Sequence, residues 1–258
     1  MPQSQPPAAA RDSSIRQLFR SNNGSTIITA DYSQIELRIL AEVSGEPKFI
    51  ELFKNDGDLH KLTASLIFNK PLEQVTKEER YIAKSINFGL SYGMGAGGLQ
   101  ANLRENGIEI DKGRAGEYIR AFFRSYPRVS EYLDRAGTFA VEHSYIRNKA
   151  GRIIRCRPAA DERERAAIVK EGKNNPIQSL NADITKLGMG RLYHRLRPFN
   201  ARLINVVHDE LVFEVPKDDA EEATGIIIIS DEMEAAGREY LTCVPVIVEI
   251  NAGEAWEK

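Results

Sequence analysis

Two acidic segments far apart in the chain have side chains that can bind a metal ion. Asp31 follows the apolar-rich run 26–30, which predicts a strand, and precedes an amphipathic segment. His208, Asp209 and Glu210 stand between apolar pairs, as at the tip of a hairpin. An isolated strand-end aspartate is typical of a turn or helix cap. A plain hairpin turn, however, favours Asn-Gly or Asp-Gly, and clustered acidic groups repel unless a cation compensates them. Such carboxylates suit metal-assisted phosphoryl transfer, although their sequence separation leaves their pairing open.

A third segment places two cations and an aromatic ring on one face of a predicted helix. Arg80, Lys84 and Phe88 recur at every fourth residue. Two cations near a helix N-terminus can bind a triphosphate, with help from the helix dipole. An aromatic ring one turn further on can stack on a base or sugar. The alternative is a surface helix with two ordinary cations, which Tyr92 and Gly93, in the same register, argue against.

The hydrophobic pattern predicts the elements that position these side chains. Strands are expected at 25–30, 202–207, 211–215 and 244–250, and a short hairpin at 144–157. Helices are expected at 33–44, 58–68, 76–91, 114–141 with an interruption near Pro127, 163–196 with a break at 174–176, and 218–240. Residues 93–98 should break the helix before them. Strands at both ends of the chain with helices between them favour an α+β fold.

Composition narrows the class of protein. The chain has 258 residues, 42% of them hydrophobic, which is enough for one large or two modest domains. It has no apolar stretch that could span a membrane, and residues 1–10 do not have the pattern of a secretory signal. The two cysteines, Cys156 and Cys243, lie far apart without metal-ligand spacing, which favours free thiols in a reducing compartment.

Charge is distributed unevenly, although the formal net charge is only −2. Residues 147–173 contain nine Lys or Arg and four acidic residues, whereas residues 209–258 contain fourteen acidic and three basic residues. This asymmetry suits a protein that holds an anionic polymer on one face and metal ions elsewhere. Two solvated faces of opposite sign are an equally good interpretation of the composition.

Three motifs together resemble the family A DNA polymerases, the DNA polymerase I type. They are DYSQIELR at 31–38, R-x3-K-x3-F-x3-YG at 80–93 and VHDE at 207–210. The resemblance covers roughly residues 14–256 and implies an antiparallel palm sheet with helical fingers. It implies template-directed nucleotidyl transfer from a dNTP to a primer 3′-hydroxyl by a two-metal mechanism. It also pairs Asp31 with Asp209 as catalytic ligands of two Mg²⁺, which Mn²⁺ can replace.

The resemblance assigns roles to further residues. The Tyr32 carbonyl would bind one metal, and Glu210 would support a metal or the primer end. Lys84 is placed with the catalytic residues. The nucleotide-binding residues are Gln34, Glu36, His60, Arg80, Lys84, Phe88 and Tyr92. Among these, Glu36 would exclude ribonucleotides while hydrogen-bonded to Tyr92, and Phe88 would discriminate against sugars that lack a 3′-hydroxyl.

The remaining predicted contacts are with DNA. Asn174 and Gln178 resemble a segment that contacts minor-groove edges of the primer–template, and Arg152 and Arg155 resemble a template-binding segment. His208 is also assigned to DNA. Two positions depart from the family pattern: Ser179 stands where glycine is usual, and Lys170 where arginine is common.

The resemblance to this family also predicts how the chain is divided into domains. Residues 1–15 would be a disordered lead-in or truncated stub, 16–45 and 197–258 the two parts of the palm, and 46–196 the fingers and adjoining helices. The thumb and exonuclease domains of the family are not covered, which predicts low processivity and no proofreading. The chain would then be a fragment, a split gene product or a compact form.

The expected partners are primer–template DNA, dNTPs and a separate chain that contains a thumb or exonuclease, without a membrane. The expected location is the cytoplasm of a bacterial or phage-infected cell, with an organelle as the alternative. Two other functions stay open. One is a single-subunit RNA polymerase, against which Glu36 and the 31–38 motif speak. The other is a non-catalytic DNA-binding subunit, against which the complete set of motifs speaks.

Overall fold

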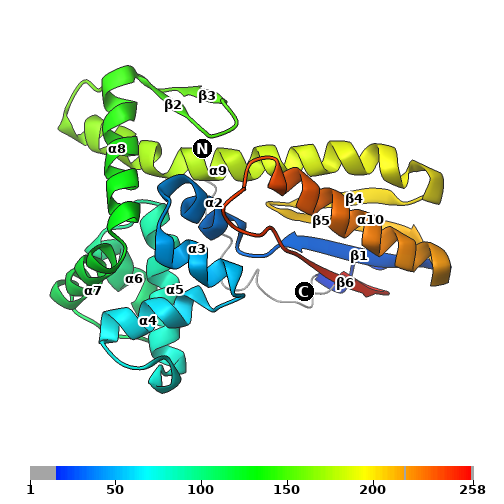
Figure 1. The fold of residues 1–258 in the computed structure, drawn as a ribbon, viewed down its shortest axis with the longest axis horizontal. Coiled ribbons are helices and arrows are strands. Elements are labelled where there is room, and N and C mark those ends of the chain that lie inside the picture. The colour runs from blue at the N-terminus through cyan, green and yellow to red at the C-terminus, as the bar shows by residue number, and fades with distance from the viewer. Residues whose placement is uncertain (1–15, 218, 257–258) are drawn as a thin grey trace. The chain divides into compact units, whose positions relative to one another are not determined.

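The computed structural model describes residues 16–217 and 219–256, and the chain divides into two compact units (Figure 1). Unit 1 consists of Met1–Ser33, Ala182–Tyr240 and Val246–Lys258, and unit 2 consists of Gln34–Asn181 and Leu241–Pro245. The predicted lead-in, residues 1–15, lies outside the described residues. The palm and fingers boundaries stay a prediction.

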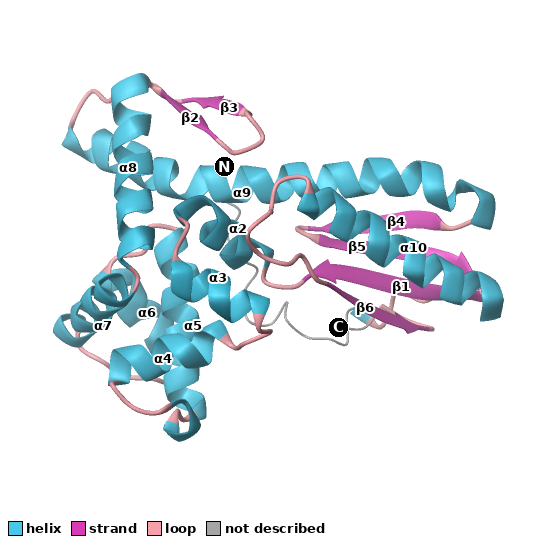
Figure 2. Ribbon diagram, viewed as in Figure 1, coloured by secondary structure: helices cyan, strands magenta, loops and turns pink. Residues whose placement is uncertain are grey.

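Unit 1 is built on an antiparallel sheet with the strand order β4-β5-β1-β6 (Figure 2). The strands are β1 (Ser25–Tyr32), β4 (Arg202–Val207), β5 (Glu210–Pro216) and β6 (Val248–Gly253). Helix α10 (Asp219–Arg238) packs on β1, β5 and β6. The first strand of the chain thus pairs with two strands from its last quarter, and the expected α+β class is confirmed.

Unit 2 is mainly helical and carries one small hairpin. Its elements are α2 (Ile35–Ser44), α3 (Pro47–Lys54), α4 (Leu59–Phe68), η2 (Leu72–Gln74), α5 (Lys77–Ser91), α6 (Ala96–Glu105), α7 (Lys112–Ser125), α8 (Pro127–His143), β2 (Tyr145–Arg147) and β3 (Ile153–Arg155). Helix α9 (Glu162–Leu196) begins in unit 2 and ends in unit 1, where η3 (Arg197–Phe199) follows it.

Local sequence signals explain where the helices of unit 2 begin. The predicted capping box before α5 is present: the Glu79 N–H donates to Thr76 Oγ1, and the Thr76 N–H donates to the Glu79 carboxylate. Asp58 caps α4 by accepting the Lys61 N–H at 3.0 Å. Pro127 opens α8 at a position where a missing N–H is tolerated.

Helix α9 runs through Pro176 without interruption, so the predicted break at 174–176 is wrong. A proline inside a helix removes one backbone hydrogen bond and costs about 3 kcal/mol. Here Pro176 is buried, and Ile177 and Leu180 beside it are fully buried. Packing of this apolar stretch therefore offsets the backbone penalty.

Two other predicted boundaries are also corrected. The helix break at 93–98 is shorter than expected, because α6 already begins at Ala96. Gly98 is helical, and a Cβ there would lie 2.8 Å from Met94, so its missing side chain makes room for Met94. The closing strand begins at Val248 and not at 244, because Pro245 has no N–H for a ladder and its carbonyl accepts Arg38 at 2.8 Å.

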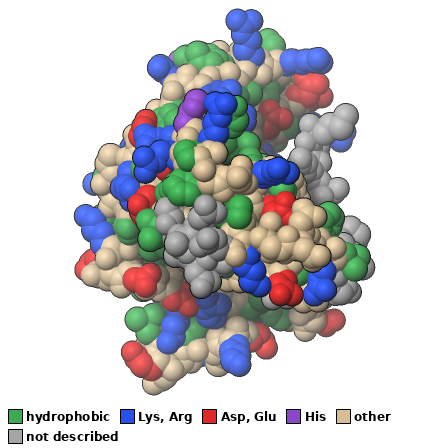
Figure 3. Space-filling view, turned by 90° about the vertical axis from the view of Figure 1, so that its right-hand side faces the viewer, with side chains coloured by type: hydrophobic (Ala, Val, Ile, Leu, Met, Phe, Trp, Pro, Cys, Tyr) green, Lys and Arg blue, Asp and Glu red, His purple; other side chains and the backbone are tan. Residues whose placement is uncertain are grey.

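The charge pattern on the surface is mixed where it can be seen. On the face shown in Figure 3, Lys and Arg side chains are interspersed with Asp and Glu side chains. In the part of the chain that the structure describes, no helix is long and apolar enough to cross a bilayer.

Candidate active site

Asp31 and Asp209 lie at the same end of the unit 1 sheet. Asp31 stands opposite Glu210 of β5 and opposite Glu249 of β6 in the strand register. Asp209 immediately precedes Glu210, in the tight turn that joins β4 to β5. His208 begins this turn with a left-handed φ of 58°, and its side chain is exposed. The register therefore brings together the two acidic segments that the sequence separates.

The carboxylate of Glu210 is held by protein donors. Glu210 is only 2% exposed. Trp256 Nε1 donates to Glu210 Oε1 at 2.6 Å, and an Arg16 amino group donates to Oε2 at 3.1 Å. The Arg16 guanidinium also lies over the Trp256 ring, 4.6 Å from its centroid. Both carboxylate oxygens thus accept hydrogen bonds from within unit 1.

Tyr32 anchors the end of β1 to the helical layer of unit 1. Its hydroxyl donates to the Met233 carbonyl of α10 at 2.8 Å, and a Cβ at Gly188 of α9 would come within 3.1 Å of that hydroxyl. Burial raises the pKa of Tyr32 far above its usual value, and the charge of Asp209 raises it further. The hydroxyl therefore stays protonated, and the residue next to Asp31 has a fixed position.

The donor set at this sheet end fits a hard divalent cation. Asp31 and Asp209 are partly exposed carboxylates, and the Tyr32 carbonyl adds a third oxygen, the ligand type that Mg²⁺ and Mn²⁺ prefer. Among the side chains that the structure describes, no group of three or more His, Cys, Asp or Glu could hold a metal by itself. Such a site would need water or phosphate oxygens as further ligands, as Mg²⁺ sites commonly do.

In unit 2, helix α5 carries the predicted triphosphate-binding stripe. Arg80 and Lys84 are exposed, and Phe88 is partly buried. Arg80 Nε donates to Asp58 Oδ2 at 2.6 Å, which orients the guanidinium toward the N-terminus of α4. Burial would raise the pKa of Asp58, but hydrogen bonds from Arg80 and from the Lys61 N–H lower it below its ordinary value. Asp58 therefore stays ionised beside Arg80.

The predicted hydrogen bond between Tyr92 and Glu36 is present, with the Tyr92 hydroxyl as donor. It joins the C-terminal cap of α5 to the first turn of α2. Gln34 precedes this turn with a φ of 51°. Its Oε1 is buried and accepts no hydrogen bond from the described residues.

His60 belongs to a buried polar network and is 4% exposed. Tyr126 contacts Thr63 hydroxyl to hydroxyl at 2.9 Å, Thr63 donates to Asn87 Oδ1 at 3.0 Å, and the Asn87 amide lies 2.9 Å from His60 Nδ1. Because Asn87 Oδ1 accepts from Thr63, its Nδ2 donates to His60, which requires a neutral imidazole. Burial lowers the pKa of His60 to about 4. Its predicted contact with phosphates stays a prediction.

The predicted DNA-binding residues of unit 2 lie on two elements. Arg152 and Arg155 are exposed on the β2–β3 hairpin, whereas Asn174 and Gln178 lie one turn apart on α9. Gln178 is exposed, and Asn174 Oδ1 is buried without a hydrogen bond from the described residues.

Asn148 connects the hairpin to α9. Its Nδ2 donates to Ser179 Oγ at 3.0 Å, and its Oδ1 accepts the Arg152 N–H at 3.0 Å. Ser179, which departs from the family pattern, is thus the residue that α9 contributes to this contact.

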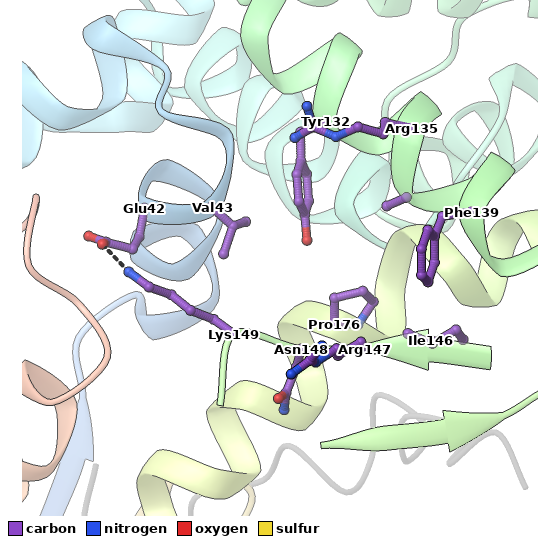
Figure 4. Close-up of a pocket in the computed structure, with 11 residues that line it drawn as sticks. Glu42, Val43, Tyr132, Arg135, Phe139, Ile146, Arg147, Asn148, Lys149 and Pro176 are labelled. Atoms are coloured by element: carbon purple, nitrogen blue, oxygen red, sulfur yellow. Dashed lines mark hydrogen bonds and ion pairs between the residues drawn. The ribbon is translucent and has the colours of Figure 1, made fainter. Parts of the chain in front are cut away.

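Unit 2 also contains a cavity of about 470 Å³ beside this hairpin (Figure 4). Among the described residues, its lining consists of Glu42, Val43, Tyr132, Arg135, Ala136, Phe139, Ile146, Arg147, Asn148, Lys149 and Pro176. Glu42 and Lys149 form an ion pair at one side. Burial raises the pKa of Tyr132 to about 12. The lining includes none of the residues predicted to bind metal, nucleotide or DNA.

Four partners of the site residues are not predicted from the sequence. They are Arg16 and Trp256, which hold Glu210, Asp58, which holds Arg80, and Asn148, which holds the hairpin. The contacts of Arg16, Trp256 and Asp58 span 194, 46 and 22 residues, whereas the contact of Asn148 with the Arg152 N–H spans only four. Trp256 is the sole tryptophan of the chain, which is the one local signal that could have drawn attention to it.

Comparisons with known proteins agree with the motifs. A sequence model of DNA polymerase family A matches residues 3–258. The DNA polymerase I of Caldicellulosiruptor bescii is 37% identical over 246 residues, which cover 94% of this chain and 28% of that protein. The DNA polymerase I of Aquifex aeolicus is 36% identical over 247 residues, covering 95% of this chain and 41% of that protein.

A solved structure is similar as well. It is the POL domain of Pol1 from M. smegmatis in complex with DNA primer-template and dNTP, with a TM-score of 0.85 and 32% sequence identity. The match covers 95% of this chain and 42% of that chain. The chain thus spans less than half the length of each of these relatives.

Proposed function

The chain belongs to DNA polymerase family A, and on this premise we propose that it catalyses template-directed nucleotidyl transfer from a dNTP to a primer 3′-hydroxyl. Primer–template DNA and dNTPs are its proposed partners, as in the similar Pol1 complex. The observation that carries the proposal is the register of unit 1. It sets Asp31 opposite Glu210, the residue after Asp209, and so gathers oxygen donors at one sheet end.

Two Mg²⁺ held by Asp31, Asp209 and the Tyr32 carbonyl would lower the pKa of the primer hydroxyl and stabilise charge on the reacting phosphate. The side chains of this chain position the substrates. Arg80 and Lys84 bind the triphosphate, and Lys84 neutralises charge on the departing pyrophosphate. Phe88 and Tyr92 form the nucleotide pocket. Mn²⁺ would substitute for Mg²⁺.

Two buried amide oxygens support this assignment independently. Gln34 Oε1 and Asn174 Oδ1 accept no hydrogen bond from the described residues. An unsatisfied buried acceptor costs about 1–3 kcal/mol, unless a ligand supplies the donor. Both residues belong to the set that the family motifs assign to nucleotide or DNA. Phosphates and most minor-groove edges are acceptors, so only a sugar hydroxyl or a base amino group of the substrate could donate to these oxygens.

The hydrogen bond between Tyr92 and Glu36 supports selection for deoxynucleotides. We place the Glu36 carboxylate against the sugar 2′ position, where a ribose hydroxyl would meet a side chain already fixed by Tyr92. Minor-groove edges of the primer–template would contact Asn174 and Gln178, Arg152 and Arg155 would bind its phosphates, and His208 would also contact the DNA.

Primer extension with Mg²⁺ tests the proposal. The wild-type chain should extend a primer, and Asp31→Asn and Asp209→Asn should each reduce the rate by at least about 100-fold, because the neutral amide no longer binds the cation. Asp134→Asn, an exposed aspartate of α8 that pairs with Lys173, is the matched control and should extend normally.

The other functions give different outcomes. Preferential use of rNTPs by the wild type would favour an RNA polymerase. DNA binding without incorporation of any nucleotide, even at high DNA concentration, would favour a binding subunit. Equal extension by wild type and both aspartate variants would contradict the metal assignment.

A further inference from the structure

Trp256 belongs to an apolar cluster that involves both sides of the turn that carries Asp209. Its ring belongs to the apolar cluster that contains Ile27 and Val212, and Val207 packs against this cluster. Val207 is the last residue of β4, directly before the turn, and Val212 follows the turn on β5. The buried Trp256 ring therefore shares one apolar cluster with residues on both sides of Asp209.

Trp256 is itself fixed by the segment before β1. Its backbone N–H donates to the Phe19 carbonyl at 2.9 Å, and the two rings meet edge to face at 5.6 Å. Arg20 forms a bridge with Ala255 next to it. The tryptophan thus has a defined position relative to β1 and to the hairpin.

The Glu210 carboxylate would disturb a metal site without these contacts. It stands directly opposite Asp31, where paired residues have Cβ atoms about 4.5–5.5 Å apart and like charges destabilise. Trp256 Nε1 and Arg16 occupy its two oxygens, at 2.6 and 3.1 Å. The positive charge of Arg16 also offsets the charge of Glu210.

We propose that Arg16 and Trp256 are positioning residues that hold Glu210 away from the bound cation and fix the Asp209 turn. Asp31 and Asp209 then bind the cation, and Glu210 serves as the anchor of the turn and not as a ligand. This rests on the proposed function only in so far as Asp31 and Asp209 bind a divalent ion.

Binding of Mn²⁺ to the 258-residue chain, measured by electron paramagnetic resonance of the free ion without DNA or nucleotide, tests the proposal. Trp256→Phe keeps a buried ring and removes the donor. It should raise the Kd for Mn²⁺ about tenfold, the size of effect typical for residues that orient metal ligands. Circular dichroism should show unchanged secondary structure in this variant.

Phe19→Leu is the matched control. It removes the edge-to-face contact on Trp256 but leaves the indole donor in place, so the Kd should stay within about twofold of wild type while thermal stability falls. Wild-type Mn²⁺ affinity in Trp256→Phe would overturn the proposal. An equal loss in Phe19→Leu would also overturn it, because packing alone would then explain the effect.

The Kd of Glu210→Gln for Mn²⁺ shows whether Glu210 anchors the turn or binds the cation. The amide still accepts from Trp256, so the Kd should rise by no more than about threefold, whereas loss of a ligand should match Asp209→Asn at about 10- to 100-fold. Primer extension is measured separately. A chain that shows this Mn²⁺ pattern but extends no primer refutes the proposed function alone. A chain that extends primers while Trp256→Phe binds Mn²⁺ normally refutes the positioning role alone.

Discussion

Each unit supports its proposed functional residues with a buried polar network, and the two networks differ in charge. In unit 1, the network is ionic: the Glu210 carboxylate accepts from Arg16 and Trp256, one residue from Asp209. In unit 2, the network of Tyr126, Thr63, Asn87 and His60 is neutral. Asn87 lies on α5, the helix that also carries Arg80 and Lys84.

Because of this difference, stability and ligand binding should change independently in unit 2 but not in unit 1. Because the unit 1 network adds a charge beside the proposed metal ligands, a change in it should alter cation affinity. The unit 2 network adds no charge, so a change in it should lower stability and leave the exposed cations of α5 able to bind phosphate.

The largest expected effect is the response of the neutral network to acid. The pKa of His60 is lowered from its usual value of 6.5 to about 4, mainly by burial; the charge of Asp58 opposes this shift, and the charges of Arg80 and Lys84 add to it. The unfolded chain therefore binds a proton between pH 6.5 and 4 that the folded chain does not. The contribution of His60 to the free energy of unfolding is fully present above pH 6.5, and up to about 3 kcal/mol of it is lost as the pH falls to 4.

Urea unfolding of wild type and His60→Gln at pH 7 and pH 4.5 measures this contribution. Glutamine can accept from Asn87 and does not titrate, so the variant should lose less stability than wild type over this interval. A group that does not interact with His60, such as Glu42, titrates in both proteins and cancels in the difference. Parallel losses in the two proteins would show that His60 is not kept neutral by the network.

The second effect concerns the exposed stripe and should appear in kinetics without a change in stability. Arg80→Ala removes a cation proposed to bind the triphosphate and should reduce kcat/KM for dNTPs about 10- to 100-fold. Lys77→Ala, an exposed lysine in the first turn of the same helix, is the control and should change kcat/KM less than about twofold. Unfolding midpoints should agree among all three proteins. A large fall in stability for Arg80→Ala would mean that its ion pair with Asp58 is structural.

Whether the sequence alone predicts one of these contacts depends on how many residues separate the two partners along the chain. The cap of α5 depends on Thr76 and Glu79, three residues apart, and is correctly predicted. The hydrogen bond between Tyr92 and Glu36 spans 56 residues and was predicted only through the family motifs. The contacts of Glu210 with Arg16 and Trp256 span 194 and 46 residues and match no local pattern. Helix α9 continues through Pro176 because tertiary burial outweighs the local preference.

The third prediction changes the neutral network directly. Thr63→Val keeps the shape of the side chain but removes the hydroxyl that joins Tyr126 to Asn87, both fully buried. Two polar groups lose a partner, so the free energy of unfolding should fall by about 1–2 kcal/mol. The kcat/KM for dNTPs should stay within about twofold of wild type, in contrast to Arg80→Ala. Thr63→Ser, which keeps the hydroxyl, is the control. A change in kcat/KM as large as that of Arg80→Ala would show that the network of unit 2 contributes to nucleotide binding as well as to stability.

The smallest expected effect lies at the hairpin of unit 2, whose anchor is also neutral. Ser179→Ala removes the acceptor of Asn148 Nδ2, and Asn148→Ala removes the whole link between α9 and the Arg152 backbone. Ser179→Ala should lower the free energy of unfolding by about 0.5–1 kcal/mol. A double-mutant cycle with Asn148→Ala should give a coupling energy of similar size, because the two side chains contact each other. Affinity for primer–template DNA should change less than about threefold in Ser179→Ala, since the exposed Arg152 and Arg155 side chains remain. Zero coupling would show that the contact between Asn148 and Ser179 contributes nothing to stability. A loss of DNA affinity as large as that of Arg152→Gln would show that this neutral anchor behaves like the charged anchor of unit 1.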